Sequence, residues 1–186
     1  MALRFTEHGV SAKNGRVSTW GGITLFQIAD GQLRNGWAEE DYYARKRQLK
    51  SGVPDEIRPP HHAPWDKTAE AHDSQTEVMV RAWLADTAHL LDLIDEISAE
   101  GPRLAELIRP EKIRLSFLFT AGHRAAFHGE IEGVYTGGFS DIDRTMISTP
   151  VRLPIAAIVD IAEAQVYRVQ LCGDRLGLHR SLLPSR

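Results

Sequence analysis

The sequence has little cysteine and no long apolar run, and these shortages exclude an intrachain disulfide and a transmembrane helix. Cys172 is the only cysteine among 186 residues, so no disulfide can form within the chain. The longest apolar stretches, such as 153–159, are far shorter than the roughly 20 residues that a transmembrane helix needs. The first residues also lack the apolar core of a signal peptide. We therefore expect a cytoplasmic protein with no membrane partner.

The chain also lacks an excess of charge of either sign. Its net charge is −3, with 22 Lys and Arg against 25 Asp and Glu. Because proteins that bind the nucleic-acid backbone normally carry a strong positive field, we expect no nucleic-acid partner. Hydrophobic residues make up 42% of the chain, which is typical of a globular protein with a packed core.

Residues 1–50 are predicted to form strands. Short apolar strands at 16–20 and 23–28 precede a turn at 29–32, and 33–39 returns as the partner strand. The Asp-Gly pair in that turn supplies the positive φ angles that a tight hairpin needs. Residues 51–75 are rich in proline and have no periodicity, which indicates a linker. Its His61-His62 pair has no further ligand at helical spacing, so no zinc site is predicted.

Residues 76–186 begin with a helix and continue as strands. Apolar side chains at spacings of three and four predict a helix over 76–98, which Gly101-Pro102 ends, and 103–108 adds one or two further turns. The strands that follow are predicted at 112–120, 124–136, 151–161 and 165–171. A helix followed by an antiparallel meander is typical of the α+β class.

An internal repeat links the two ends of the chain. A shift of 133 residues aligns 28–49 with 161–182, and six of the 22 pairs are identical, Asp41/Asp174 among them. The second copy has a helix and two more strands before its matching segment. We therefore interpret 1–50 as the C-terminal half of a domain and 76–186 as a complete copy. A lone meander is marginally stable, so the half copy must pack on the complete one as a pseudo-dimer, or on a second chain as a homodimer.

The repeated segments resemble the SnoaL-like polyketide cyclase family. Residues 22–41 resemble its closing hairpin, in which an apolar strand, an Asp-Gly turn and a second strand lead to a Trp (here Trp37) and an Asp (here Asp41). Residues 124–137 resemble the strand that usually ends in Gly-Thr-His-Thr-Gly, with Tyr135 in the place of the His. Residues 174–178 resemble the Asp-x-x-Gly-Leu segment after the last strand. The resemblance implies a nuclear-transport-factor-2-like fold, a cone-shaped curved antiparallel sheet around N-terminal helices.

The resemblance also implies acid/base chemistry without metal or cofactor. In SnoaL-like cyclases, an Asp at the position of Asp174 is the general acid/base of an aldol ring closure, and Asp41 carries the same match in the first copy. A carboxylate at the mouth of an apolar cone would have a raised pKa, which suits proton transfer. The alternative is that Asp174 caps the following turn or pairs with Arg175 or Arg180, and that Asp41 is a solvated surface residue.

Other candidate residues lie on the strands and on the helix. Tyr135 shares an apolar strand face with Gly129 and Gly133, and its hydroxyl could orient a substrate carbonyl or simply lie in the core. The two glycines leave room for a ligand or permit sheet curvature. The opposite face carries His128, Glu130 and Glu132. We interpret it as a hydrated outer face or a dimer interface and not as a metal site. The residues expected to line a ligand are Trp37, Phe127, Ile131 and Trp83.

Three functions remain open at this stage. The first is a cyclase, isomerase or hydrolase that acts on a small hydrophobic oxygenated molecule, with Asp174, Asp41 and Tyr135 as catalytic candidates. The second is a non-catalytic binding module for such a molecule. The third is an interaction or dimerisation module. A pocket with an inward carboxylate would favour the first, a pocket with apolar walls the second, and a filled cone the third.

Overall fold

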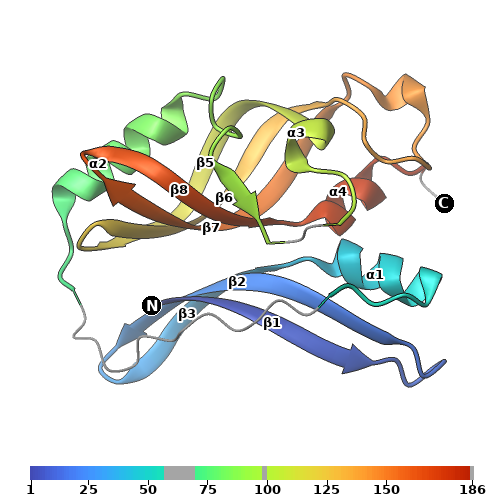
Figure 1. Cartoon of the computed structure of the whole chain (residues 1–186). Helices are drawn as coiled ribbons and strands as arrows, with labels where there is room; N and C mark the ends of the chain where they lie inside the picture. Colours follow the sequence, from blue (N-terminus) through green and yellow to red (C-terminus); the bar gives the residue numbers. More distant parts are fainter. Residues whose placement is uncertain (57–69, 98–99, 185–186) are drawn as a thin grey trace.

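The computed structural model describes residues 1–56, 70–97 and 100–184 and arranges them as two stacked sheets (Figure 1). The smaller sheet is antiparallel, with the order β1-β2-β3. Its strands are β1 (Ala2–Val10), β2 (Val17–Ala29) and β3 (Gln32–Glu40). Helix α1 (Tyr42–Ser51) follows directly and completes the N-terminal unit.

The larger sheet has five strands in the order β4-β8-β7-β6-β5. All neighbours are antiparallel except β4 and β8. The strands are β4 (Ile94–Glu96), β5 (Ile108–Ala121), β6 (Arg124–Tyr135), β7 (Pro150–Ala162) and β8 (Gln165–Gly173). The helical elements are α2 (Ser74–Ala85), α3 (Leu104–Leu107), the 3-10 turn η1 (Arg144–Met146) and α4 (Arg175–Ser181). The predicted α+β class with a curved antiparallel sheet is confirmed.

Two glycines on β6 permit the curvature of this sheet. A Cβ atom at Gly129 would lie 2.5 Å from the Arg114 carbonyl oxygen. A Cβ atom at Gly133 would lie 2.1 Å from the Arg109 carbonyl oxygen. Both contacts lie beside irregularities in the β5–β6 register, at Leu115/Phe117 and at Pro110/Lys112. Bulges of this kind bend a sheet strongly. The glycines therefore accommodate the backbone of the neighbouring strand.

The five-stranded sheet buries both of its faces. One face packs under α2, α3, α4 and the segment between β6 and β7, which contribute Val80, Leu84, Leu104, Leu107, Phe139, Ile142, Leu178 and Leu182 to the main core. The other face packs on the three-stranded sheet (Figure 1). This second core contains Ile23, Leu25, Ile97, Ala126, Ala156, Ile158 and Cys172. A sheet that is apolar on both sides needs two covering layers, and the N-terminal unit supplies one.

Several predicted elements differ in the structure. The helix predicted over 76–98 ends at Ala85, where Asp86 leaves the helical angles (φ −87°, ψ 78°) and its carboxylate hydrogen-bonds the Nδ1 of His89 at 3.0 Å. Residues 94–96 then join the sheet edge as β4. The sequence predicts strands as far as residue 50, whereas 42–51 form α1, capped by Asp41.

The strands predicted at 16–20 and 23–28 form the single strand β2, and β1 is a strand for which the sequence gives no predicted bounds. None of the helices in the described ranges is long and apolar enough to cross a membrane.

Candidate functional site

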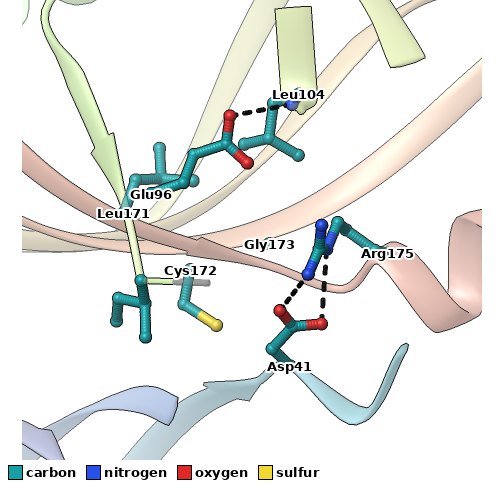
Figure 2. Close-up of a pocket in the computed structure, with 8 residues that line it drawn as sticks. Asp41, Glu96, Leu104, Leu171, Cys172, Gly173 and Arg175 are labelled. Carbon is teal, nitrogen blue, oxygen red and sulfur yellow. Dashed lines mark hydrogen bonds and ion pairs between the residues drawn. The ribbon is translucent and has the colours of Figure 1, made fainter. Parts of the chain in front are cut away.

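Asp41 and Arg175 form a buried ion pair between the two units (Figure 2). The Nη2 of Arg175 donates to Asp41 Oδ2, and its Nε donates to Oδ1 at 3.3 Å. The remaining guanidinium hydrogens reach the carbonyl oxygens of Pro102 at 2.9 Å and Glu100 at 3.2 Å. Asp41 also accepts the Ala44 N–H at 3.1 Å as the cap of α1. Both charges are therefore neutralised and hydrogen-bonded, as buried charges must be.

A small chamber with both charged and aliphatic walls adjoins this pair. Its lining residues are Asp41, Glu96, Ile97, Leu104, Leu171, Cys172, Gly173 and Arg175 (Figure 2). Its volume is ≈ 10 Å³, which is about the space that a single water requires. Burial raises the pKa of Glu96, while the Leu104 N–H at 2.9 Å and Arg175 oppose that rise. Burial also raises the pKa of the Cys172 thiol well above its ordinary value. The chamber is too small for an organic substrate.

Asp174, the first catalytic candidate, is the cap of α4. Its Oδ1 accepts the Gly177 N–H at 2.8 Å. The equivalent hydrogen bond of Asp41 caps α1, and the backbone angles of the two aspartates agree within a few degrees, φ −73° and ψ 71° against φ −80° and ψ 67°. Arg175 bonds Asp41 and not its neighbour Asp174. The two aspartates thus have the same local role, and among the described residues only Asp41 has a cationic partner across the interface.

Tyr135, the third catalytic candidate, lies in an aromatic cluster on the other face of the sheet. It is 2% exposed, and its hydroxyl accepts the Phe139 N–H at 3.2 Å. Phe139 also contacts Tyr43 and His179, with ring centroids 5.1 Å and 5.0 Å away. Burial raises the pKa of the Tyr135 phenol. Of the two alternatives for Tyr135, a contact with a substrate or a place in the core, the ring occupies the core.

His179 is a buried imidazole in the same cluster. Its Nε2 lies 3.0 Å from the Asp141 carboxylate, and this hydrogen bond lowers the pKa of Asp141. Its Nδ1 is buried and has no hydrogen-bond partner among the described residues. If Asp141 accepts the Nε2 proton, Nδ1 carries the lone pair, which is the tautomer of a general base.

The four predicted ligand-lining residues do not share one cavity wall. Phe127 and Ile131 are fully buried in the main core, with Trp83 packed beside Phe127 at a centroid distance of 6.4 Å. The Nε1 of Trp83 is buried without a hydrogen-bond partner in the described ranges. Trp37 lies on the opposite side of the sheet, stacked on Phe117 at 4.2 Å in the interface core.

The polar face of β6 also contributes to the interface. His128 Nε2 lies 2.9 Å from Glu39 Oε1 of the N-terminal unit. Glu132 bonds Arg114, and Glu130 lies 3.7 Å from Arg152. This agrees with the predicted interface or hydrated face. Within the described ranges, no group of three His, Cys, Asp or Glu side chains could hold a metal ion. His61 and His62 lie outside the described residues.

Sequence reasoning missed the partners of these candidates. The sequence predicts a helix at Glu96 and gives no signal for Asp141 or His179. The one available signal is the alignment at a shift of 133 residues, which sets Arg175 opposite Tyr42 and so marks it as a charged residue without a charged counterpart.

Comparisons with known proteins yield fold likenesses only. No family model and no curated protein matches the chain. Among the solved structures that match are a protein from Jannaschia sp. CCS1, provisionally named a SnoaL-like polyketide cyclase (12% identity, 68% of this chain, 100% of that chain, TM-score 0.46), and TsrD from Streptomyces laurentii (18% identity, 61% of this chain, 98% of that chain, TM-score 0.43). Residue roles cannot be transferred at such identities. In the order of its motifs and in its α+β fold, the chain resembles the SnoaL-like polyketide cyclases.

Proposed function

We propose that the chain is a non-catalytic interaction module of SnoaL-like type, in which the N-terminal unit takes the place of a partner subunit. The observation that carries this proposal is the use of the three candidate catalytic groups in structural contacts. Asp41 is paired with Arg175, Asp174 caps α4, and the Tyr135 hydroxyl binds the Phe139 backbone. The chamber beside Asp41 has room for about one water.

The matching geometry of the two units supports a common origin. β2 and β7 begin and end 133 residues apart, and so do β3 and β8. The turns between them place Asp30 and Glu163 at nearly the same positive φ, 53° and 50°. Each second strand leads to a capping aspartate and a helix. Agreement in strand bounds, turn conformation and cap is what two copies of one domain would give.

The interface between the units supports the role of a built-in subunit. Apolar side chains from both sheets form its core, and Trp37 stacks on Phe117 within it. Polar contacts join the units at separate points, among them the Asp41–Arg175 ion pair and the Glu39–His128 hydrogen bond. An apolar centre with polar contacts that fix the register is typical of a permanent subunit interface. Such a permanent interface is expected if the N-terminal unit, which is part of the same chain, takes the place of a partner subunit.

The test of catalytic silence is proton exchange at carbon. Cyclases and isomerases of this type remove a proton from the carbon next to a carbonyl. In D₂O this step replaces the proton by deuterium, and the replacement can be measured on simple ketones although the natural substrate is unknown. We expect the protein to exchange the α-protons of hydrophobic ketones in D₂O, followed by NMR, no faster than buffer does. Exchange that is accelerated by the native protein and lost in Asp174→Asn would overturn the proposal.

A second candidate function is a cofactor-independent acid/base enzyme, and the His179–Asp141 pair favours it. The pair has the carboxylate–imidazole geometry of a general base, with Nδ1 unpartnered among the described residues and Tyr135 in the same aromatic cluster. The rings of Tyr135 and His179 are each 2% exposed, so a substrate could reach them only after the residues that cover them moved. Exchange that His179→Gln abolishes, and that Asp174→Asn leaves intact, would select this function.

A further inference from the structure

Helices α1 and α4 lie at one end of the contact between the two units (Figure 1). Residues of both helices line a groove that is open to solvent. It holds ≈ 430 Å³ of space that solvent can enter. Its lining residues are Tyr42, Arg45, Lys46 and Leu49 of α1 and Leu176 and Arg180 of α4. The four residues of α1 are spaced i, i+3, i+4 and i+7, so they form one continuous face of that helix. The groove therefore has two helical walls, one from each unit.

The charges along the groove are all positive. Arg45, Lys46 and Arg180 line it without any carboxylate among the lining residues. None of the three forms an ion pair with a carboxylate in the described part of the chain. Arg45 lies over the Trp20 ring, 5.2 Å from its centroid, and this contact positions its guanidinium. Like charges that face one another across a groove repel, and an anionic occupant relieves that repulsion.

Carboxylates near the groove offset part of its positive potential but do not pair with its cations. Glu40 and Glu7 act on Tyr42 at the rim, and Asp141 interacts with Lys46. In the described part of the chain, none of these carboxylates lies within ion-pair distance of a groove cation. The three cations therefore remain available to an anionic occupant.

The floor of the groove is apolar. Leu176 is 9% exposed, and Leu49 is half-buried beside it. At the rim, the ring of Tyr42 is 43% exposed and offers an aromatic contact. An apolar floor between cationic walls matches an amphipathic segment that carries leucine-type side chains on one face and carboxylates along its flanks. Because the groove is open to solvent, it suits a peptide better than an enclosed lipid chain.

We propose that this groove docks an acidic amphipathic helix of a partner protein. The inference rests on the proposed function, since the groove exists only where α1 of the N-terminal unit packs beside α4, the helix that follows the five-stranded sheet. Charge attraction accelerates the encounter, and insertion of an apolar side chain over Leu49 and Leu176 holds the complex. Binding therefore weakens steeply with salt.

The experiment uses the full chain and a synthetic probe. The probe is a fluorescein-labelled helical peptide with Leu at i, i+3 and i+7 and Glu at most other positions, and its binding is followed by anisotropy. We expect saturable binding that Lys46→Glu/Arg180→Glu weakens by about tenfold or more, since each reversal replaces attraction by repulsion. The matched control, Lys13→Glu/Lys112→Glu, changes the net charge equally at two exposed positions that do not line the groove, and it should bind like the native chain.

Three outcomes would overturn the inference. They are no saturable binding, equal weakening in both double variants, and binding to phosphatidylserine vesicles in place of the peptide. The mass of the chain is measured on the same samples by sedimentation. If the chain is monomeric and does not bind the peptide, only the docking site is contradicted. If the chain is dimeric, the proposed built-in subunit is contradicted.

Discussion

The guanidinium of Arg175 meets the carboxylate of Asp41 between the two units, and each side chain is only 3% exposed. The pair lies 134 positions apart in the chain, at the start of α1 and of α4. The alignment at a shift of 133 residues sets Tyr42 opposite Arg175. A symmetric dimer would have two such ion pairs, whereas the described residues contain one, because a tyrosine stands opposite this arginine.

The first prediction concerns this ion pair. Arg175→Met leaves the Asp41 carboxylate buried without its cation, so we expect a loss of about 3 to 5 kcal/mol in the free energy of unfolding. Asp41→Asn/Arg175→Met removes both charges, and asparagine still caps α1, so the double variant should recover a large part of the loss. Urea denaturation of the native chain and of both variants measures the difference. A double variant as unstable as Arg175→Met would mean that packing, and not the unpaired charge, carries the effect.

The second prediction separates capping from catalysis at Asp174. Asp174→Ala removes the acceptor for the Gly177 N–H, and we expect it to cost about 1 kcal/mol. Asparagine is an equally good cap, so Asp174→Asn should unfold at nearly the same urea concentration as the native chain. Equal destabilisation in both variants would show that the negative charge itself matters at this position.

The third prediction uses the raised pKa of Glu96. In the folded chain this carboxyl keeps its proton to a higher pH than its ordinary value of 4.5, chiefly because it is buried. Between those two pKa values the folded state binds more protons than the unfolded state, so ionisation of Glu96 lowers stability as pH rises. Glu96→Gln cannot ionise. Its stability relative to the native chain should therefore increase from about pH 4 to about pH 7 in urea titrations.

A matched control for this effect is Glu111→Gln, because Glu111 is 58% exposed. Its stability difference from the native chain should not increase over that pH range. If the Glu96→Gln difference also stayed constant, burial would not govern the protonation of Glu96.

The fourth prediction makes Cys172 a reporter of unit separation. The thiol is buried between the sheets, its pKa is raised well above the ordinary value, and the chain has no other cysteine. We expect a disulfide reagent such as Ellman's to react with the native chain far more slowly than with the urea-unfolded chain. Arg175→Met should speed the reaction, because the units open more often. Immediate reaction of the native chain would contradict the packing of the two sheets.

The strands with strong apolar patterns could be predicted from sequence because that signal is local. The predicted strands at 151–161 and 165–171 lie within one or two residues of β7 and β8. The same kind of signal missed β1 and α1, since 42–50 is rich in charge and carries little apolar periodicity. It also extended α2 too far, because the apolar residues at 90, 91 and 94 continue the helical spacing after the helix has ended at Ala85.

The site depends on contacts that no local pattern encodes. Asp41 and Asp174 stood out through the repeat, and both are caps. The partners of these residues and of their neighbours lie far apart in sequence, as with Arg175 for Asp41 and Asp141 for His179. A motif can identify the residue type at a position. Only the packed chain determines whether a carboxylate there meets a cation, a backbone N–H or a ligand.

The measurement that tests the built-in subunit most directly is the mass of the full chain in solution. Sedimentation equilibrium at increasing micromolar concentrations should give a single species of 20.8 kDa, because the N-terminal unit already covers the face through which a second copy would pack. The buried Cys172 thiol should stay unreactive in the same samples. A species of twice that mass would contradict the account, since the three-stranded sheet would then be covering another copy of the chain.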